Sequence, residues 1–281
     1  MRKNILRRAT AALLGAAAIA LMAPATSASA EDSVATLSSG AKLMPGQTMR
    51  SGDSLLVMQG DGNLVLYLQS PTSGARGPAL WSSGTWGNWN AYAFMQPDGN
   101  LVVYRQGSTA PSDAVWSTGT AGSWGASFSL YRGQMTLWPT MAGGKGWESR
   151  TGLAPAIGFG GAYPEAFITS SRNIESGQWI QSKSVWLVNQ PDGNLVLYRK
   201  RDGAALWSSG TWNHPHGQLV LWNSQWYPLL SLQDRDNGQR IWSSPGKGQD
   251  GTYGIVQDDG NFVIYGSSGA ALWSTGTWGN W

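Results

Sequence analysis

The sequence predicts an all-β protein made of two tandem halves, each built from three similar units. Three observations carry this prediction. A ten-residue segment recurs four times, a tryptophan-containing segment follows it at regular spacing, and 38 glycines accompany only 12% charged residues. Self-similarity at a fixed period is the signature of repeat architectures, and short strands joined by tight turns are rich in glycine. After residue 30, no stretch has a convincing helical period.

The recurring segment reads MQGDGNLVLY at 58–67, MQPDGNLVVY at 95–104, NQPDGNLVLY at 189–198 and VQDDGNFVIY at 256–265. Alternate side chains of a strand share a face. We therefore expect Leu64 and Leu66 to point into a core, together with Leu56 and Met58 before them. The D-G-N centre is a tight-turn signal, and proline precedes it in two copies. Each copy is predicted to be a strand–turn–strand hairpin.

The polar members of the segment recur at every second position as Gln, Asp, Asn, Val and Tyr. A neutral sugar needs both donors and acceptors, which amides, a carboxylate and a phenol supply, while valine packs against ring carbons. In the alternative interpretation, Asp and Gly only make the turn and Asn only caps it, which explains the fixed Gln and Tyr less well. The predicted carbohydrate-binding residues are Gln59, Asp61, Asn63, Val65, Tyr67, Gln96, Asp98, Asn100, Val102, Tyr104, Gln190, Asp192, Asn194, Val196, Tyr198, Gln257, Asp259, Asn261, Val263 and Tyr265.

A tryptophan follows each unit, mostly within W-S-[ST]-G. The spacing is 35 and then 31 residues in both halves, which makes the chain a tandem duplication of a triplicate. Sugar-stacking platforms are one interpretation, but a ring at the same strand position in every unit favours burial about a pseudo-threefold axis. These residues are Trp81, Trp116, Trp147, Trp207, Trp242 and Trp273.

Two units are degenerate, namely SLYRGQMTLW at 129–138 and WNSQWYPLLS at 222–231. Neither keeps the acidic residue, so we expect both to retain the strands and to have lost the site. Spacing places these residues at the five motif positions: Leu130, Arg132, Gln134, Thr136 and Trp138 in the first, and Asn223, Gln225, Tyr227, Leu229 and Ser231 in the second.

Residues 1–30 are predicted to be a secretory signal, because a basic start, an apolar stretch and a small-residue cleavage site follow one another. The protein is therefore expected to be secreted. Two domains are expected, at 31–152 and 165–281. The small, uncharged stretch 153–164 is expected to be a linker or crossover.

Charge and cysteine content exclude several classes of partner. The chain has 19 Lys and Arg against 16 Asp and Glu, and four of the basic residues lie in the predicted signal, which leaves a mature balance of −1. No basic run remains, so nucleic acid and membrane insertion are not expected. The chain has no cysteine, so a packed core and not a disulfide framework must stabilise it.

An enzyme is not expected. Each motif aspartate stands alone in its own copy, so paired carboxylates for glycoside hydrolysis are lacking, and the chain has neither a nucleophile elbow nor a phosphate-binding loop. His214 and His216 form an H-x-H pair, which we interpret as a surface loop and not as a metal site. No cofactor or metal is expected.

The Q-x-D-x-N-x-V-x-Y pattern resembles the mannose-binding site of the bulb-type lectins, the monocot mannose-binding (B-lectin) family, in a tandem two-domain bacterial-type form. The resemblance implies two type II β-prisms, each of three antiparallel four-stranded sheets, and metal-independent binding. It places Asp61 and Asn63 on the mannose 2-hydroxyl, Gln59 on the 3-hydroxyl, Tyr67 on the 4-hydroxyl and Val65 against the ring, with the same roles in the other three intact copies. Unlike many plant members, this chain lacks a disulfide.

The leading prediction is a secreted multivalent lectin for mannose-containing oligo- or polysaccharides. Two alternatives stay open at this point. One is a lectin-like bacteriocin that uses the same sites to bind surface polysaccharide, and the other is an adhesion module in which the motif is only a fold signature. The family also exchanges C-terminal strands, so a homodimer or strand exchange between the two halves is a further expectation.

Overall fold

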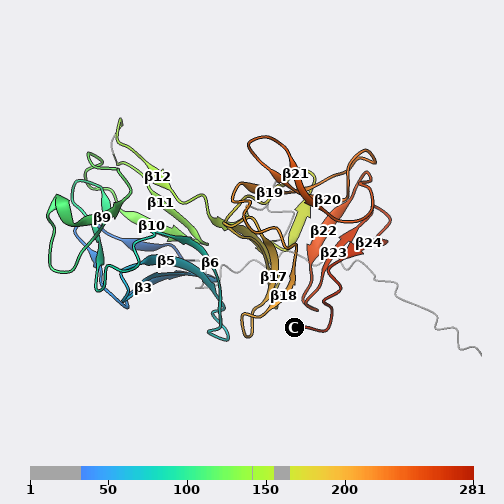
Figure 1. Ribbon diagram of the computed structural model, residues 1–281, viewed down its shortest axis with the longest axis horizontal. Helices are drawn as coiled ribbons and strands as arrows, with labels where there is room; N and C mark the ends of the chain where they lie inside the picture. The colour runs from blue at the N-terminus through green and yellow to red at the C-terminus, as the bar shows by residue number, and fades with distance from the viewer. Residues whose placement is uncertain (1–32, 141, 155–164) are drawn as a thin grey trace, which may run out of the picture.

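The computed structural model describes residues 33–140, 142–154 and 165–281 (Figure 1). Within these ranges the secondary structure is strands β1–β24 and a single 3₁₀ turn, η2 (Pro111–Asp113). The all-β prediction is confirmed. The predicted secretory signal and most of the predicted linker lie outside the described residues. No helix in the described part of the chain is long and apolar enough to cross a membrane.

The first half forms three antiparallel four-stranded sheets. Each unit contributes three consecutive strands, and the lead-in before the first motif supplies a fourth strand to every sheet. The sheets are β3 (Thr48–Ser51), β4 (Ser54–Met58), β5 (Leu64–Gln69) and β6 (Arg76–Ser82); β2 (Lys42–Leu43), β7 (Tyr92–Met95), β8 (Leu101–Tyr104) and β9 (Ala114–Ser117); and β1 (Ala35–Leu37), β10 (Phe128–Tyr131), β11 (Gln134–Leu137) and β12 (Trp147–Glu148).

The second half repeats this plan with two departures from the expected four strands. One sheet gains a fifth strand, β13, which pairs in parallel with β15, and another has three strands plus an isolated Ile174–Leu219 bridge. The sheets are β13 (Gly152–Leu153), β15 (Gln178–Gln181), β16 (Val185–Asn189), β17 (Leu195–Arg199) and β18 (Ala205–Ser208); β14 (Phe167–Thr169), β22 (Tyr253–Val256), β23 (Phe262–Tyr265) and β24 (Ala271–Ser274); and β19 (Gly217–Leu221), β20 (Leu230–Asp234) and β21 (Arg240–Ser243).

The three sheets of each half meet through one tryptophan apiece, as the spacing predicted. The rings of Trp81, Trp116 and Trp147 lie edge to face, with centroids 5.3–5.9 Å apart. Those of the second half form an equivalent triad at 5.7–6.0 Å. Edge-to-face packing is the favoured arrangement for aromatic rings. The triads mark two pseudo-threefold axes, and each half is a β-prism.

The inward face of each hairpin builds the core. Leu56, Met58, Leu64 and Leu66 are buried in the hydrophobic cluster of the first half, as predicted. The matching leucines and isoleucines of the second half form a second cluster. Burial of these side chains is the main stabilising term for each prism.

The two halves, which meet near the centre of the ribbon in Figure 1, share a hydrophobic contact. Trp179 and Trp186 belong in sequence to the second half but are buried in the core cluster of the first. Asp53 of the first half accepts a hydrogen bond from the Trp186 indole at 2.6 Å and pairs with Lys200 at 2.6 Å. A largely buried carboxylate needs such partners, so the contact combines apolar packing with a polar network.

The C-terminal strand of each half pairs within its own half, β12 with β11 and β24 with β23. These two strands are therefore not exchanged between the halves within the described chain. β13 connects the halves in a different way: it leaves the first prism and adds to the edge of β15. The predicted boundary between 152 and 153 falls inside this strand.

Candidate functional site

Each intact motif is a hairpin whose turn is closed by its own backbone. In the first copy, Gln59 N–H donates to Asn63 O at 2.9 Å and Gly62 N–H donates to Gln59 O at 3.1 Å. Gly62 has a φ of +91°, and a Cβ there would lie 1.9 Å from Asn88 O. Only glycine satisfies both constraints, which explains the fixed D-G-N centre.

Glutamine and tyrosine of each copy lie side by side across this hairpin. The Gln Nε2 group donates to the Tyr hydroxyl at 3.0–3.1 Å in all four copies. The pairs are Gln59 with Tyr67, Gln96 with Tyr104, Gln190 with Tyr198, and Gln257 with Tyr265. The structure therefore brings together the two residues that turn formation alone did not explain.

Aspartate holds the turn in every copy. Its Oδ1 atom accepts the backbone N–H of the motif asparagine two residues later, at 2.9–3.0 Å. The pairs are Asp61 with Asn63, Asp98 with Asn100, Asp192 with Asn194, and Asp259 with Asn261. This is a standard way for aspartate to stabilise a turn. The alternative interpretation, in which Asp serves to make the turn, is therefore correct in part.

Asparagine fastens the turn to the strand that carries the core tryptophan. Asn63 Oδ1 accepts the backbone N–H of Thr85 at 3.1 Å and the Ser83 hydroxyl at 3.1 Å. Thr85 donates in turn to Gly62 O at 2.6 Å. The other intact copies repeat this network through Thr118 and Thr120, Ser209 and Thr211, and Thr275 and Thr277.

These hydroxyl residues are members of the site that the motif alone did not identify. Their signal was present in the sequence, because the W-S-[ST]-G-T segment repeats with the motif. Each copy thus depends on two repeated segments, of which the second orients the asparagine of the first.

A matched set of hydrogen-bonding atoms has no protein partner within the described chain. It comprises the Asp Oδ2, the Gln Oε1, both hydrogens of the Asn Nδ2 and the Tyr hydroxyl hydrogen. A backbone N–H can only donate, so the bond from Thr85 fixes which Asn63 side-chain atom is oxygen. Each copy therefore offers two acceptor atoms and two donor groups.

The sites are shallow. The four motif valines are only 2–4% exposed, whereas most of their polar neighbours are half-buried or exposed. Tyr104 and Asn261 are the buried exceptions. A valine floor with a polar rim can hold one face of a small ring without enclosing it.

The third copy borders the contact between the halves. Tyr198 packs against the core cluster of the first half. Burial raises the pKa of Tyr198 above its ordinary value of 10.0, although the hydrogen bond from Gln190 opposes this effect. Its phenol therefore remains a donor over a wide range of pH.

Aromatic and basic residues on neighbouring strands surround three of the copies. Arg76 lies 4.6 Å over the Tyr67 ring, and Tyr265 stacks on Tyr253 at 5.5 Å. Tyr92 faces Tyr104 at 6.2 Å and also lines a hollow of about 390 Å³ beside the second copy. Sequence reasoning did not find these neighbours, because they lie outside the repeated segments.

In the degenerate unit of the first half, residues of the second half cover the position that the site occupies in the intact copies. Met135 N–H donates to Ser149 Oγ at 3.0 Å, as Leu64 N–H does to Ser83 Oγ, which confirms the predicted positions of Gln134, Thr136 and Trp138. Arg132 pairs with Glu165 of the second half. A Cβ on Gly133 would lie 2.3 Å from the Trp179 ring, so the turn is covered.

One position in this unit needs correction. Leu130 is buried in the core, and Tyr131, which pairs with Gln134 across the hairpin, takes the place of the motif glutamine. The turn is one residue shorter than in the intact copies, which shifts the first strand by one position.

The predicted alignment of the degenerate unit in the second half is wrong. Trp222 N–H donates to Leu229 O, and Leu230 N–H donates to Ser244 Oγ, as Gln59 and Leu64 do in the first copy. The motif positions of Gln, Asn, Val and Tyr therefore fall on Trp222, Leu229, Ser231 and Gln233. Asn223, Gln225 and Tyr227 therefore hold no equivalent position, and Leu229 and Ser231 hold the Asn and Val positions instead of the predicted Val and Tyr positions, because three additional residues lengthen the turn.

This second degenerate site is filled by aromatic rings. Trp222 stacks on Tyr227 with centroids 4.1 Å apart, and its indole N–H donates to Ser231 Oγ at 2.8 Å. The loss of the polar set, expected from sequence, holds for both degenerate units despite the changed alignment.

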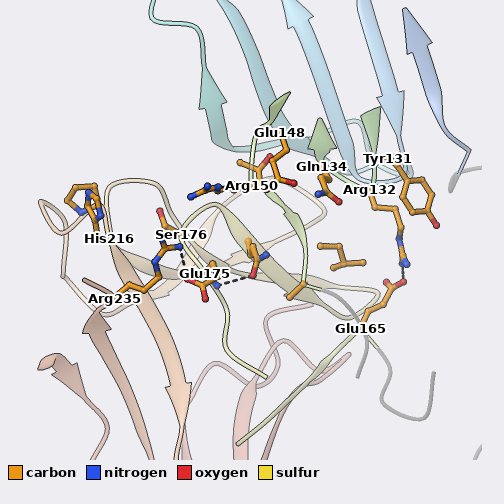
Figure 2. Close-up of a pocket in the computed structure, with 15 residues that line it drawn as sticks. Tyr131, Arg132, Gln134, Glu148, Arg150, Glu165, Glu175, Ser176, His216 and Arg235 are labelled. Atoms are coloured by element: carbon orange, nitrogen blue, oxygen red, sulfur yellow. Dashed lines mark hydrogen bonds and ion pairs between the residues drawn. The ribbon is translucent and has the colours of Figure 1, made fainter. Parts of the chain in front are cut away.

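A cleft of about 580 Å³ lies between the halves (Figure 2). Glu148 and Arg150 of the first half line one wall, and Glu175, His216 and Arg235 of the second half line the other. Its charges are paired: Arg235 with Glu175 at 3.7 Å and Arg150 with Glu148 at 3.8 Å.

His216 faces Asp236 at 2.8 Å. Among the residues that the structure describes, no three His, Cys, Asp or Glu side chains gather into a potential metal site. His214 instead belongs to the loop over the third motif turn, where its carbonyl oxygen lies against Gly193.

No protein-family model matches the chain. Mannose-specific lectin 2 from Colocasia esculenta is 37% identical over 97 residues, which is 34% of this chain and 34% of the lectin. Mannose-specific lectin CEA from the same plant is also 37% identical over 97 residues. The match thus spans about a third of the length of these curated relatives.

Among solved structures, a monomeric mannose-binding lectin from Gastrodia elata shares 28% identity, with a TM-score of 0.36, over 40% of this chain and 98% of its own. The two-domain, fetuin-binding agglutinin from Scilla campanulata shares 26% identity, with a TM-score of 0.32, over 83% of this chain and 94% of its own. The fold assignment rests on the sheet topology and not on these superpositions. In sequence, the chain is homologous over part of its length to mannose-specific lectins of monocot plants.

Proposed function

We propose that the protein is a secreted, multivalent lectin that binds mannose-containing glycans through its four intact motif copies. The main support for this proposal is the set of hydrogen-bonding atoms that lack a protein partner in each intact copy within the described chain. Two acceptors and two donor groups over a buried valine suit the hydroxyls and the C–H face of one hexose. We also propose that residues 1–30 are a secretory signal and that the two lectin domains span 31–152 and 165–281.

The resemblance to the bulb-type lectins implies the proposed contacts, and the atoms that the fold leaves available fit them. Asp Oδ2 and Asn Nδ2 lie at the turn and form an acceptor and donor pair for the mannose 2-hydroxyl. Gln Oε1 accepts from the 3-hydroxyl, and the Tyr hydroxyl donates to the 4-hydroxyl. Every one of these bonds is made by the protein itself, so binding needs no metal ion.

The shallow geometry sets the expected strength. A site that contacts one sugar face buries little ligand area, and about 1 mM, or roughly −4 kcal/mol, is a reasonable affinity for a monosaccharide. Four sites on one chain can raise the affinity for a branched polymer by about 10²- to 10⁴-fold where several engage together. The tandem duplication therefore favours mannose polymers over free mannose as ligands.

The test is calorimetric titration of the mature chain with methyl α-mannoside and with branched mannan. The matched variant replaces Asp61, Asp98, Asp192 and Asp259 with Asn, which can still cap the turn through Oδ1 but turns the outer acceptor into a donor. Asp234→Asn, which alters a turn-capping carboxylate of a degenerate unit, is the control. Binding by the wild type and the control, but not by the fourfold variant, is expected. Equal mannan binding by all three would refute the proposed site.

A further inference from the structure

Two groups of six account for twelve of the 17 tryptophans of this protein. Six form the half-buried triads on the prism axes. Another six are 59–73% exposed and lie in the loops that follow the triad strands. The exposed loop tryptophans are Trp86, Trp89, Trp124, Trp212, Trp278 and Trp281.

The loop of the first copy folds directly over the motif turn. Gly87 N–H donates to Asp61 O at 2.9 Å, and the Asn88 backbone lies against Gly62. Covalent geometry then places the Cα of Trp86 within about 5 Å of the Asp61 carbonyl oxygen. The backbone of Trp86 thus lies close to Asp61, a residue proposed to hold the sugar.

The same backbone bond recurs in the other three intact copies. Its donors are Gly122, His214 and Gly279, and its acceptors are the carbonyl oxygens of Asp98, Asp192 and Asp259, at 2.8–2.9 Å. The neighbouring exposed tryptophans are Trp124 in the second copy, Trp212 in the third, and Trp278 and Trp281 in the fourth.

The two degenerate units provide an internal comparison. After Thr151 the corresponding loop reads Gly-Leu-Ala and becomes β13, and after Ser244 it reads Pro-Gly-Lys. Neither contains tryptophan. Trp138 and Trp226 are exposed in these units, but they lie within the hairpins. Loop tryptophans therefore accompany intact motifs one by one.

We propose that the loop tryptophans are stacking platforms for the sugar residue next to the one held by each motif. This inference rests on the proposed lectin function and specifies its ligand: a linear run of at least two hexoses, with mannose in the motif. The indole face offers a large, rigid apolar surface to the C–H face of a pyranose. Because the tryptophans follow the motif copy by copy, a glycan continuous with the bound sugar is the occupant that fits.

The test compares the wild type with a variant that combines Trp86→Ala, Trp89→Ala, Trp124→Ala, Trp212→Ala, Trp278→Ala and Trp281→Ala. Trp226→Ala, which removes an equally exposed indole from a degenerate unit, is the control. The probes are methyl α-mannoside and linear α-mannotetraose, and far-UV circular dichroism checks the fold. The monosaccharide affinity of the sixfold variant should stay within about twofold of wild type, while its tetraose affinity should fall about three- to tenfold.

Tryptophan fluorescence gives a second readout. Tetraose should change the emission of the wild type and the control but not that of the sixfold variant. If the variant binds tetraose as tightly as the wild type, the platforms are refuted while the lectin function stands. If the wild type binds neither sugar, the lectin function fails and the platforms fail with it.

Discussion

Replacing Trp179 with Ala should destabilise the half of the molecule to which this residue does not belong in sequence. Trp179 is 1% exposed and packs in the first-half cluster against the turn at Gly133. An aromatic side chain buries about 150–250 Å², which at about 25 cal/mol per Å² corresponds to about 4–6 kcal/mol. Measured Trp-to-Ala costs in cores are about 3–5 kcal/mol. We expect a loss within that range.

Thermal and urea unfolding of the full chain test this expectation. A loss of this size should lower the melting temperature by about 10 °C and separate the unfolding of the two prisms into distinct transitions. Trp226→Ala removes an exposed indole and should change stability by less than about 0.5 kcal/mol. A loss below about 1 kcal/mol for Trp179→Ala, with unchanged cooperativity, would refute the shared core.

Three further predictions concern the motif copies. Gly62→Ala combines a positive φ with a Cβ 1.9 Å from Asn88 O, so it should cost at least about 1–3 kcal/mol and remove one site; unchanged stability and stoichiometry would contradict the proposed turn. Because burial raises the pKa of Tyr198, the neutral phenol should persist above pH 10, and its contribution to stability should be present below pH 10 and lost as pH rises through the folded-state pKa. The difference in ultraviolet absorbance titration between wild type and Tyr198→Phe checks this, and a transition at or below pH 10 would contradict it. EDTA should leave mannan binding unchanged, because protein atoms make every proposed bond; a loss restored by a divalent cation would show otherwise.

The hairpins, the core leucines and the two tryptophan triads could be predicted because each follows from local repetition. Strand alternation assigns Leu64 to the core without any knowledge of its neighbours. The spacing of Trp81, Trp116 and Trp147 likewise implied one ring per sheet. These features depend on the spacing of repeated residues along the chain, and this spacing persists even where residues within one unit are substituted.

The features that sequence did not predict depend on turn length or on contacts between distant segments. The turn of the degenerate unit in the second half contains three additional residues. The motif residues that would have revealed this insertion are replaced in that unit. An alignment based on constant spacing therefore put Tyr227 at a motif position that it does not hold. Trp179 lies in a strand that resembles the lead-in of the first half, so nothing local showed that it packs into the other prism. The exposure of Trp86 and its equivalents depends on how their loops pack against the motif turns, and no local sequence pattern specifies that packing.

The central claim is that four copies of one hydrogen-bonding set each hold a sugar. The most direct test follows the side-chain amides in ¹H–¹⁵N spectra of the full chain during titration with methyl α-mannoside. The amides of Gln59, Gln96, Gln190 and Gln257 should shift together with millimolar midpoints, along with those of the four motif asparagines, while Gln134 and Gln233 of the degenerate units should not move. Shifts confined to the cleft between the halves, or none in the four motifs at saturating sugar, would contradict the account.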